Sequence, residues 1–412
     1  MEPEKPVPKR FIGLDIHKHY LVAYGVDAEL NRLLGPRRVE YADLDAWMRQ
    51  ALTPEDAVVI EMTTNTWQIY DSLLPHVQSV TVVHPPHVAL IVRSQVMNDK
   101  IAARILATLL AKGLLCGIWV PPEPVRQQRA LIAQRAKMTR LCTQAKNRLH
   151  AVLHSRCLLP PTEDPFSPEQ RAWWLGLKLS PLEKAVVRSD LDTLLFAQQQ
   201  IQSLEETLNQ LGGQDERLPL LVQLPGIRLI SGLTILAAIG DISRFPSPKK
   251  LVGYAGLGSR VHDSGQTTRT GKITKAGRRD LRFTLVEAAQ IAANTHPHWQ
   301  AELKRLEPRL GRIKAIVAIA RKLLIEVWYV LTNQVADRFS EPERIAHKLL
   351  QHAYLLGQAN RAPELSTGGY VRLQLDRLHI GQTLKAIPWT PKKKPIPLPP
   401  STLPTRQTWP SQ

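Results

Sequence analysis

Short apolar runs alternate with amphipathic segments over the first part of the chain. Residues 11–26 predict two β-strands rich in branched and aromatic side chains, separated by the polar sequence HKH. Further apolar runs follow at 57–62 and 79–84, and helical spacing lies between them, around 44–52 and 67–74. Strands that alternate with helices up to about residue 118 predict an α/β domain.

A helical pattern replaces this alternation. Residues 125–157 carry eight lysines and arginines and no acid. A second long helix is predicted over about 182–211, where apolar residues recur at steps of three and four: Leu194, Ala197, Ile201, Leu204, Leu208 and Leu211. This spacing fits an antiparallel helical hairpin between two domains and a dimerising coiled coil equally well.

A second, mostly helical region is predicted from Leu218. Its start, LPGIRLISGLTILAAIGDI, is similar to a helix-hairpin-helix, in which a glycine turn lets backbone amides face a phosphate; a plain helix N-terminus explains the same residues. Helices are expected at about 276–294 and 311–335. From Pro388 on, eight of 25 residues are proline and three consecutive lysines occur, which predicts a disordered basic tail.

Composition narrows the class of protein. The 412 residues include 54 Lys+Arg and 36 Asp+Glu, a net charge of +18, which suits a polyanionic partner such as DNA. The 43% of hydrophobic residues exclude wholesale disorder. No apolar run is long enough to span a membrane and the start resembles no secretory signal, so we expect a cytosolic protein without membrane contact. Three cysteines without a CxxC motif favour neither a disulfide framework nor a zinc site.

Carboxylates interrupt two of the predicted strands. Asp15 lies in FIGLDI and Glu61 in VVIEM, where burial is costly unless the charge is paired or binds a metal. A third acid, Asp99, begins a predicted helix, a position that helix-dipole compensation also explains. Acids from two strands and one helix are able to converge on Mg²⁺ or Mn²⁺. His17 and His19 are interpreted as packing or hydrogen-bonding residues.

These motifs resemble a known family. GLDIHK, VVIEMT, VHPPHV with NDKIAAR, and KNRLHAVL follow one another as in the DEDD transposases of the IS110 insertion-sequence family. The resemblance implies a ribonuclease-H-like (RuvC-like) fold whose metal ligands are Asp15, Glu61 and Asp99. The family's fourth acid falls on Ala102, so one ligand is missing here.

A second block carries the same resemblance. Residues 245–282 are glycine-rich and basic, and Gly271-Lys272-Ile273-Thr274-Lys275 with Gly277, Leu281 and Arg282 match a motif of the family's C-terminal domain. The family's nucleophilic serine falls on Ser264 of HDSGQ, with Ser259 as the alternative. A serine before glycine in a basic loop is also an ordinary turn. The resemblance covers roughly 10–155 and 218–295.

Basic residues in both blocks are candidates for contacts with nucleic acid; a solvated basic face is the alternative. They are Arg126, Arg129, Lys146 and Arg148 in the helix, and Arg260, Arg269, Lys272, Lys275, Arg278 and Arg279 in the glycine-rich block.

The sequence therefore predicts an α/β plus α protein. Its parts are a ribonuclease-H-like domain at 10–120, a basic helix and coiled-coil linker at 121–215, a C-terminal transposase domain at 216–340 and a disordered tail at 385–412. The expected function is that of a DNA transposase or recombinase. The resemblance further implies a phosphoserine intermediate, a guide RNA, homodimers or homotetramers, and a bacterial or archaeal cytosol. A metal-dependent junction nuclease and an inactive nucleic-acid-binding relic are the alternatives.

Overall fold

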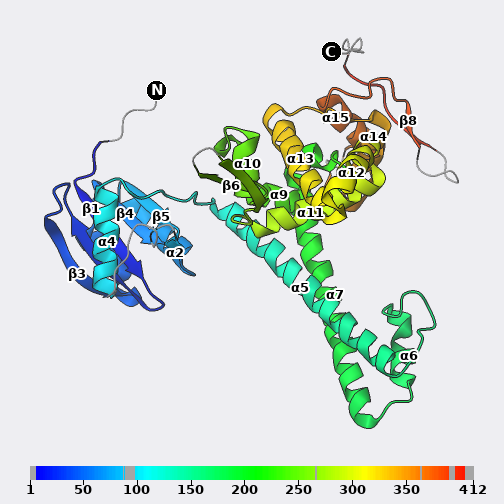
Figure 1. Ribbon diagram of the computed structural model, residues 1–412, viewed down its shortest axis with the longest axis horizontal. Coiled ribbons are helices and arrows are strands. Elements are labelled where there is room, and N and C mark those ends of the chain that lie inside the picture. The colour runs from blue at the N-terminus through cyan, green and yellow to red at the C-terminus, as the bar shows by residue number, and fades with distance from the viewer. Residues whose placement is uncertain are drawn as a thin grey trace. The chain divides into compact units, whose positions relative to one another are not determined.

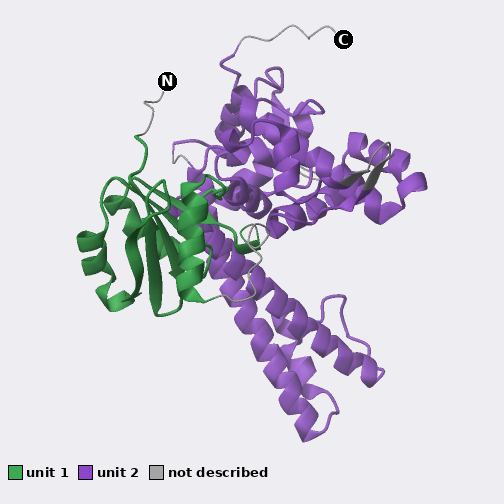
Figure 2. Ribbon diagram, turned by 60° about the vertical axis from the view of Figure 1, so that its left-hand side comes forward, with its two compact units in different colours: residues 1–121 green, residues 122–412 purple. Residues whose placement is uncertain are grey.

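The chain folds into two compact units, residues 1–121 and 122–412 (Figure 2). The computed structural model describes residues 6–86, 88, 98–264, 267–361, 364–388 and 395–403, with the backbone alone at 261–264 and 267–270. No helix within these ranges is both long and apolar enough to cross a lipid bilayer.

The first unit is built on a five-stranded mixed sheet (Figure 1). Its strands are β1 (Arg10–Ile16), β2 (Tyr20–Val26), β3 (Arg32–Glu40), β4 (Asp56–Glu61) and β5 (Ser79–Val83), in the order β3-β2-β1-β4-β5. The strands β1, β2 and β3 pair antiparallel, and β1, β4 and β5 pair in parallel. With helices α1 (Leu44–Ala51), α2 (Thr66–Leu73) and α4 (Asp99–Ala111), the predicted α/β class is confirmed.

The central strands are buried on both faces because helices cover both. Side chains alternate between the faces of a strand. Val58 and Ile60 of β4 belong to the core that includes Trp47 of α1, whereas Val59 packs with Leu106 of α4. A central position in the sheet therefore explains why this stretch is apolar throughout.

A glycine lets α4 lie unusually close to the sheet. A Cβ on Gly13 of β1 would lie 2.1 Å from the carbonyl oxygen of Ala103. Ala103 and Ala107 are fully buried at the same contact. Asn98 caps the helix, since its side chain accepts a hydrogen bond from the amide of Ile101 at 3.0 Å. These small residues and the cap fix Asp99, the first residue of α4, at the edge of β1.

The second unit begins with a long helical hairpin. Helix α5 (Glu123–Ser155) packs along α7 (Pro181–Gln214), and α6 (Arg171–Gly176) lies in the connection (Figure 1). Leu191 and Leu194 of α7 share a buried cluster with Leu149 and Leu153 of α5. The heptad positions thus serve an intramolecular hairpin, one of the two alternatives that the sequence left open. Dimerisation through this segment stays a prediction.

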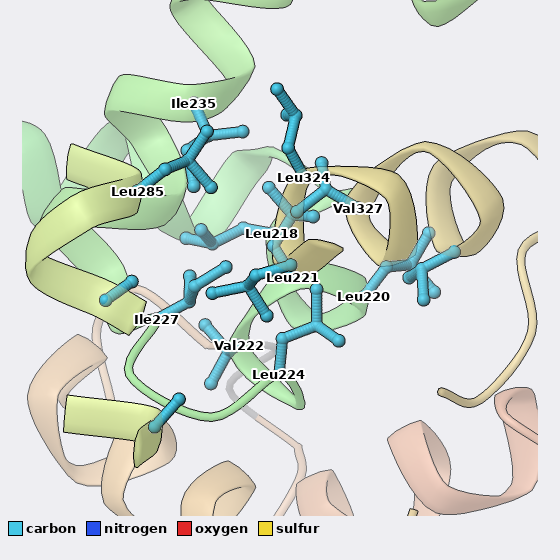
Figure 3. Close-up of a cluster of buried hydrophobic side chains, with 14 of the residues drawn as sticks. Leu218, Leu220, Leu221, Val222, Leu224, Ile227, Ile235, Leu285, Leu324 and Val327 are labelled. Carbon is cyan, nitrogen blue, oxygen red and sulfur yellow. The ribbon is translucent and has the colours of Figure 1, made fainter. Parts of the chain in front are cut away.

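The remainder of the second unit is mostly helical, as predicted. Its elements are α8 (Leu218–Val222), α9 (Leu229–Ile239), α10 (Pro248–Tyr254), the hairpin β6 (Ser259–Ser264) and β7 (Thr267–Ile273), α11 (Arg279–Thr295), α12 (Pro297–Leu310), α13 (Arg312–Asn333), α14 (Pro342–Leu356) and α15 (Thr367–Arg377). Leucines of α8 and the following turn lie at the centre of the core, against Leu285 and Leu324 (Figure 3).

Packing explains the glycine of the LPGI turn. Gly226 has a φ of +76°, and a Cβ there would lie 2.1 Å from the carbonyl oxygen of Ala288 in α11. The turn therefore needs glycine for its backbone conformation and for its contact with α11. Approach of a phosphate, the helix-hairpin-helix interpretation, is not required to account for it.

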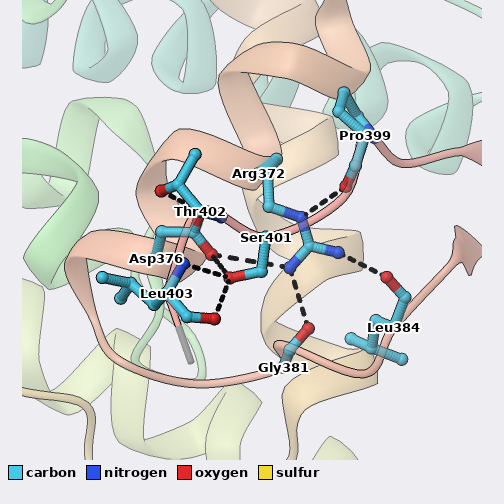
Figure 4. A network of polar contacts seen from close by, with 8 residues as sticks. All are labelled: Arg372, Asp376, Gly381, Leu384, Pro399, Ser401, Thr402 and Leu403. Carbon is cyan, nitrogen blue, oxygen red and sulfur yellow. Dashed lines mark hydrogen bonds and ion pairs between the residues drawn. The ribbon is translucent and has the colours of Figure 1, made fainter. Parts of the chain in front are cut away.

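The prediction of a disordered tail is wrong for residues 395–403, which fold onto α15. The buried guanidinium of Arg372 donates to the carbonyl oxygens of Pro399 and Gly381, each at 2.8 Å, and to that of Leu384 (Figure 4). Ser401 donates to Asp376 at 2.7 Å. Strand β9 (Ile396–Pro397) pairs with β8 (Ala386–Ile387). The proline-rich composition indicated disorder, because proline has no amide hydrogen to donate to a neighbouring strand. Here the side chain of Arg372 donates the hydrogen bonds to the backbone carbonyls instead.

Candidate active site

The three predicted carboxylates all lie at one edge of the sheet in the first unit. Leu14 of β1 pairs with Ile60 of β4 in parallel register, so the next residues along, Asp15 and Glu61, occupy neighbouring strand ends. Asp99 reaches the same edge from the start of α4. Parallel strands present their carboxyl ends on one side of a sheet, which explains the convergence.

Asp15 and Asp99 form a compact cluster with His17. One ligand atom from each of the three residues lies within 4.8 Å of the others. His17 Nε2 is 3.2 Å from Asp15 Oδ2 and 3.4 Å from Asp99 Oδ2. All three side chains are partly exposed, which leaves the cluster open to small ions. His17 follows Asp15 by two residues, a spacing that repeats the side-chain direction of a strand.

Several polar side chains that the sequence analysis missed position this cluster. Tyr41 Oη donates to the carbonyl oxygen of His17, and Asn65 Nδ2 donates to the same oxygen at 3.1 Å. Tyr20 Oη donates to Asp99 Oδ2 at 2.9 Å, and the Arg38 guanidinium lies 3.6 Å from the centre of the Tyr20 ring. The tyrosines and Asn65 come from separate segments, so no sequence spacing marked them.

The carboxylates are held in an unfavourable electrostatic environment. Burial raises the pKa of Asp15, the neighbouring His17 opposes this shift, and Asp99 adds to it. Burial also raises the pKa of Glu61, and the charge of Asp15 adds to that shift. A hydrogen bond to Asp99 raises the pKa of the Tyr20 hydroxyl. Like charges that the fold brings together favour a cation between them.

The donor set fits a hard divalent cation. Two carboxylates and an imidazole within 4.8 Å provide oxygen and nitrogen ligands, and Glu61 lies beside Asp15 as a further oxygen donor. Oxygen-rich sites with few protein ligands suit Mg²⁺ or Mn²⁺, which keep water or substrate oxygens in their remaining positions. Ala102 follows Asp99 by one helical turn, so the missing fourth acid would belong to the same face of α4.

The two candidate serines lie at opposite ends of a β-hairpin in the second unit. Ser264 pairs with Thr267 next to the turn, whereas Ser259 pairs with Ile273 at the base. The side chain of Ser264 lies outside the described residues, as does that of Arg269. The backbone places Ser264 next to the turn of this two-stranded element.

Some of the predicted basic residues make contacts within the second unit. Arg129 donates to the carbonyl oxygens of Ala237 and Ala238, at 2.7 and 2.9 Å, at the end of α9. Arg148 pairs with Asp190 at 2.7 Å, and Lys146 lies 5.0 Å from the ring centre of Phe166. Arg126 is half-buried. The helix therefore owes part of its basic character to packing inside the second unit.

Basic residues around the β-hairpin are more accessible. Arg260, Lys272, Lys275 and Arg279 are exposed, and Arg278 is half-buried and pairs with Asp280 at 3.0 Å. Burial lowers the pKa of Arg129, and the charge of Arg278 adds to the shift. Arg129 and Arg278 thus contribute to one positive region near the hairpin. Lys146 and Arg148 lie about 25 Å further along α5.

Two transposase family models match the chain. A model described as a transposase, of the IS110 DEDD type, matches residues 12–157, and one described as "Transposase IS116/IS110/IS902 family" matches residues 218–304. Together they cover more than half of the 412 residues. The first match contains the carboxylate cluster and the second contains the β-hairpin.

Named relatives extend over most of the chain. The transposase for insertion sequence element IS1111A of Coxiella burnetii is 26% identical over 80% of this chain and 91% of its own length. The pilin gene-inverting protein of Moraxella bovis is 27% identical over 77% of this chain and 94% of its own. A probable family 20 transposase of Pseudomonas aeruginosa is 24% identical over 79% and 98%, respectively.

Proposed function

We propose that this chain, which belongs to the IS116/IS110/IS902 family of transposases, cuts and rejoins DNA through a covalent link to Ser264. Membership of the family makes the chain a DNA transposase or recombinase. Its DEDD domain implies the use of a divalent metal. The assignment of the metal ligands is supported by the carboxylate cluster, because Asp15, His17 and Asp99 converge within 4.8 Å where the sequence predicted two of them. The assignment of Ser264 is supported by the family resemblance.

The sheet topology supports a ribonuclease-H-like, RuvC-like assignment for the first unit. Three antiparallel strands are extended by two parallel ones, in the order β3-β2-β1-β4-β5, with α4 packed on β1. In this assignment Asp15, Glu61 and Asp99 would hold Mg²⁺ or Mn²⁺, and the ion would supply positive charge that stabilises a scissile phosphate. His17 and Tyr20 orient the carboxylates through the contacts described above.

Ser264 performs the bond exchange in this proposal. Its hydroxyl oxygen attacks the phosphorus, a serine–phosphate bond forms, and the bond to the deoxyribose 3′-oxygen breaks. The serine proton is lost to solvent or a nearby base, and the departing 3′-oxygen is protonated to a hydroxyl. The phosphoserine bond keeps the energy needed for rejoining. Exposed cations beside the hairpin, Arg260 and Lys272 among them, hold the flanking phosphates.

Trapping the covalent intermediate tests this mechanism. With Mg²⁺ and a DNA substrate that carries the element's end, Ser264→Ala should abolish the DNA–protein adduct seen on a denaturing gel. Ser259→Ala, at the other end of the same hairpin, is the matched control and should retain it. Nicking that survives Ser264→Ala without an adduct would instead support a metal-dependent nuclease. Absence of cleavage with any divalent metal would support an inactive relic.

We further propose that subunits share one active site and that a structured RNA guides the choice of DNA. The family resemblance supports both, and dimers or tetramers would bring the carboxylates of one subunit to the serine of another. Mixing two inactive variants, Ser264→Ala and Asp15→Asn, tests the sharing. Recovery of part of the wild-type cleavage in the mixture supports it, and two inactive proteins that stay inactive together contradict it. Cleavage that is unchanged after removal of RNA contradicts the guide.

A further inference from the structure

A cavity in the second unit lies between the start of α9 and one face of α14. Its volume is about 740 Å³, within the size range of small-molecule sites. Five residues of α14 line it, and four of them recur at helical spacing: Lys348, Gln351, His352 and Leu355. Apolar walls come mainly from Val222, Leu229 and Ile396. This cavity shares no residue with the carboxylate cluster or the β-hairpin.

One buried side chain in the cavity has hydrogen-bonding capacity that the described part of the chain does not use. His352 is 2% exposed, and neither of its ring nitrogens has a hydrogen-bond partner among the described residues. Burial lowers its pKa to about 4, and the charge of Lys348 adds to the shift. The imidazole is therefore neutral at pH 7 and offers one donor and one acceptor. An unsatisfied buried polar group is destabilising, so a ligand that pairs with it is the simplest explanation.

Basic side chains line the cavity beside the start of α9. Arg228 is exposed at the residue before α9. Lys348, whose pKa burial lowers to about 7, donates through Nζ to the carbonyl oxygens of Leu224 and Ile227 in the LPGI turn. Leu229, the first residue of α9, also lines the cavity, so the positive end of this helix dipole lies beside it. An anionic group is thus favoured near Arg228, beside an apolar interior that ends at a neutral imidazole.

We propose that this cavity binds one nucleotide, with its base in the apolar interior against His352 and Gln351 and its phosphate at Arg228 and the start of α9. A base has an apolar face and an edge of hydrogen-bond donors and acceptors. Tyr354 and Leu355, at the rim of the cavity, provide apolar surface for contact with the face of the base. The choice of a nucleotide as ligand rests on the DNA transposase function, whereas the cavity stands without it. The nucleotide is either part of a single-stranded nucleic acid or free in solution.

Direct binding tests the proposal with the full-length protein. The probes are a fluorescein-labelled single-stranded 12-mer, the same strand with one abasic position at each site in turn, a blunt duplex, and adenosine and uridine monophosphates. Divalent metal is left out, so failure of the Ser264 chemistry does not affect this readout. His352→Phe keeps a ring of similar size without the nitrogens, and Leu355→Trp fills the rim. Leu373→Trp, on α15 and equally exposed, is the matched control.

We expect His352→Phe and Leu355→Trp each to weaken single-strand binding about tenfold, as loss of one buried hydrogen-bonded contact predicts. Leu373→Trp and duplex binding should not change, and an unchanged melting temperature of His352→Phe excludes misfolding. Binding of the monophosphates but not of the strand supports a free nucleotide as ligand. If both variants bind strand and monophosphates like the wild type, or lose duplex affinity to the same extent, the proposal is wrong.

Discussion

Each unit holds carboxylates close together, yet the two sites differ in how the repulsion is relieved. Asp15, Glu61 and Asp99 lie at an open sheet edge, with His17 between Asp15 and Asp99. Asp337 and Glu326 are 4% and 2% exposed inside the second unit, where Glu326 pairs with Arg338. Burial raises the pKa of Asp337 to about 6, and Glu326 adds to the shift. The interior pair holds a proton up to about pH 6, whereas the open cluster suits a metal ion.

This difference separates carboxylates that a metal ion can reach from carboxylates that are enclosed in a core. A perturbed carboxylate by itself indicates little, because an ion-pair network in a core produces the same shift. Access is the distinguishing property, since a divalent cation and a phosphate have to reach the site. The partly exposed cluster offers that access and the buried pair does not.

The largest expected effect comes from the open cluster. Asp15→Asn keeps the shape of the side chain but removes a negative ligand, and we expect strand cleavage to fall by about 10³-fold or more. Single-turnover cleavage over a Mg²⁺ titration measures this. Asp27→Asn, an exposed acid in the turn after β2, is the control and should cleave normally. If both variants lost strand cleavage to the same extent, the carboxylate cluster would be no more important for cleavage than Asp27.

An intermediate effect is expected at the buried pair, on stability alone. The raised pKa means that the folded state holds the Asp337 proton more tightly than the unfolded state. Below about pH 4 both states are protonated and the site costs nothing; as pH rises towards 6 stability falls, and the full cost remains above 6. Asp337→Asn should therefore stabilise the protein by about 1–3 kcal/mol at pH 8 and hardly at all at pH 4.

Denaturant unfolding at the two pH values measures the effect. Glu343→Gln, an exposed acid on α14, is the control. A variant that loses stability at both pH values would mean that the Asp337 carboxylate stabilises the native protein, with Arg338 compensating the cost of its burial. The contrast between the two carboxylate sites would then fail.

The smallest expected effect is a gain in metal affinity at the open cluster. Ala102 is partly exposed one turn after Asp99, so Ala102→Asp adds the fourth carboxylate without filling a core. We expect tighter Mn²⁺ binding by about tenfold, the order of one well-placed ligand. Isothermal titration with Mn²⁺ measures the affinity. Lys100→Gln, on another face of the same turn, changes the net charge by the same one unit, and an equal gain there would assign the effect to the local field.

Local apolar runs predicted most of the first unit because each strand and helix carries its own pattern. Strand β3 was not foreseen, since RLLGPRRVE contains exposed charges and a proline and lies at the edge of the sheet. Asp15 and Asp99 were predicted as site residues because Asp15 interrupts an apolar strand and Asp99 begins a helix. His17 and Asn65 were missed as functional residues, because their roles depend on loops that meet only in the folded chain.

In the second unit, composition was a less reliable guide. The basic residues of α5 suggested a nucleic-acid surface, but Arg129 and Arg148 bind groups of the protein itself. The proline-rich end suggested disorder. Instead, one buried arginine, Arg372, donates hydrogen bonds to a backbone carbonyl before β8 and to another after β9. Long-range partners of this kind leave no periodic signal. Nucleophile assignment rests on the family resemblance and awaits the Ser264→Ala experiment.

The return of residues 395–403 onto α15 has a consequence for biosynthesis. The core of the second unit includes Leu398, so it closes only after that residue has left the ribosome. At about 5–20 residues per second, the stretch between residue 121 and Leu398 takes about 15–55 s to translate. The carboxylate cluster is therefore able to fold well before the core of the second unit is complete. In the proposed mechanism, the capacity to hold a metal would precede the capacity to break DNA.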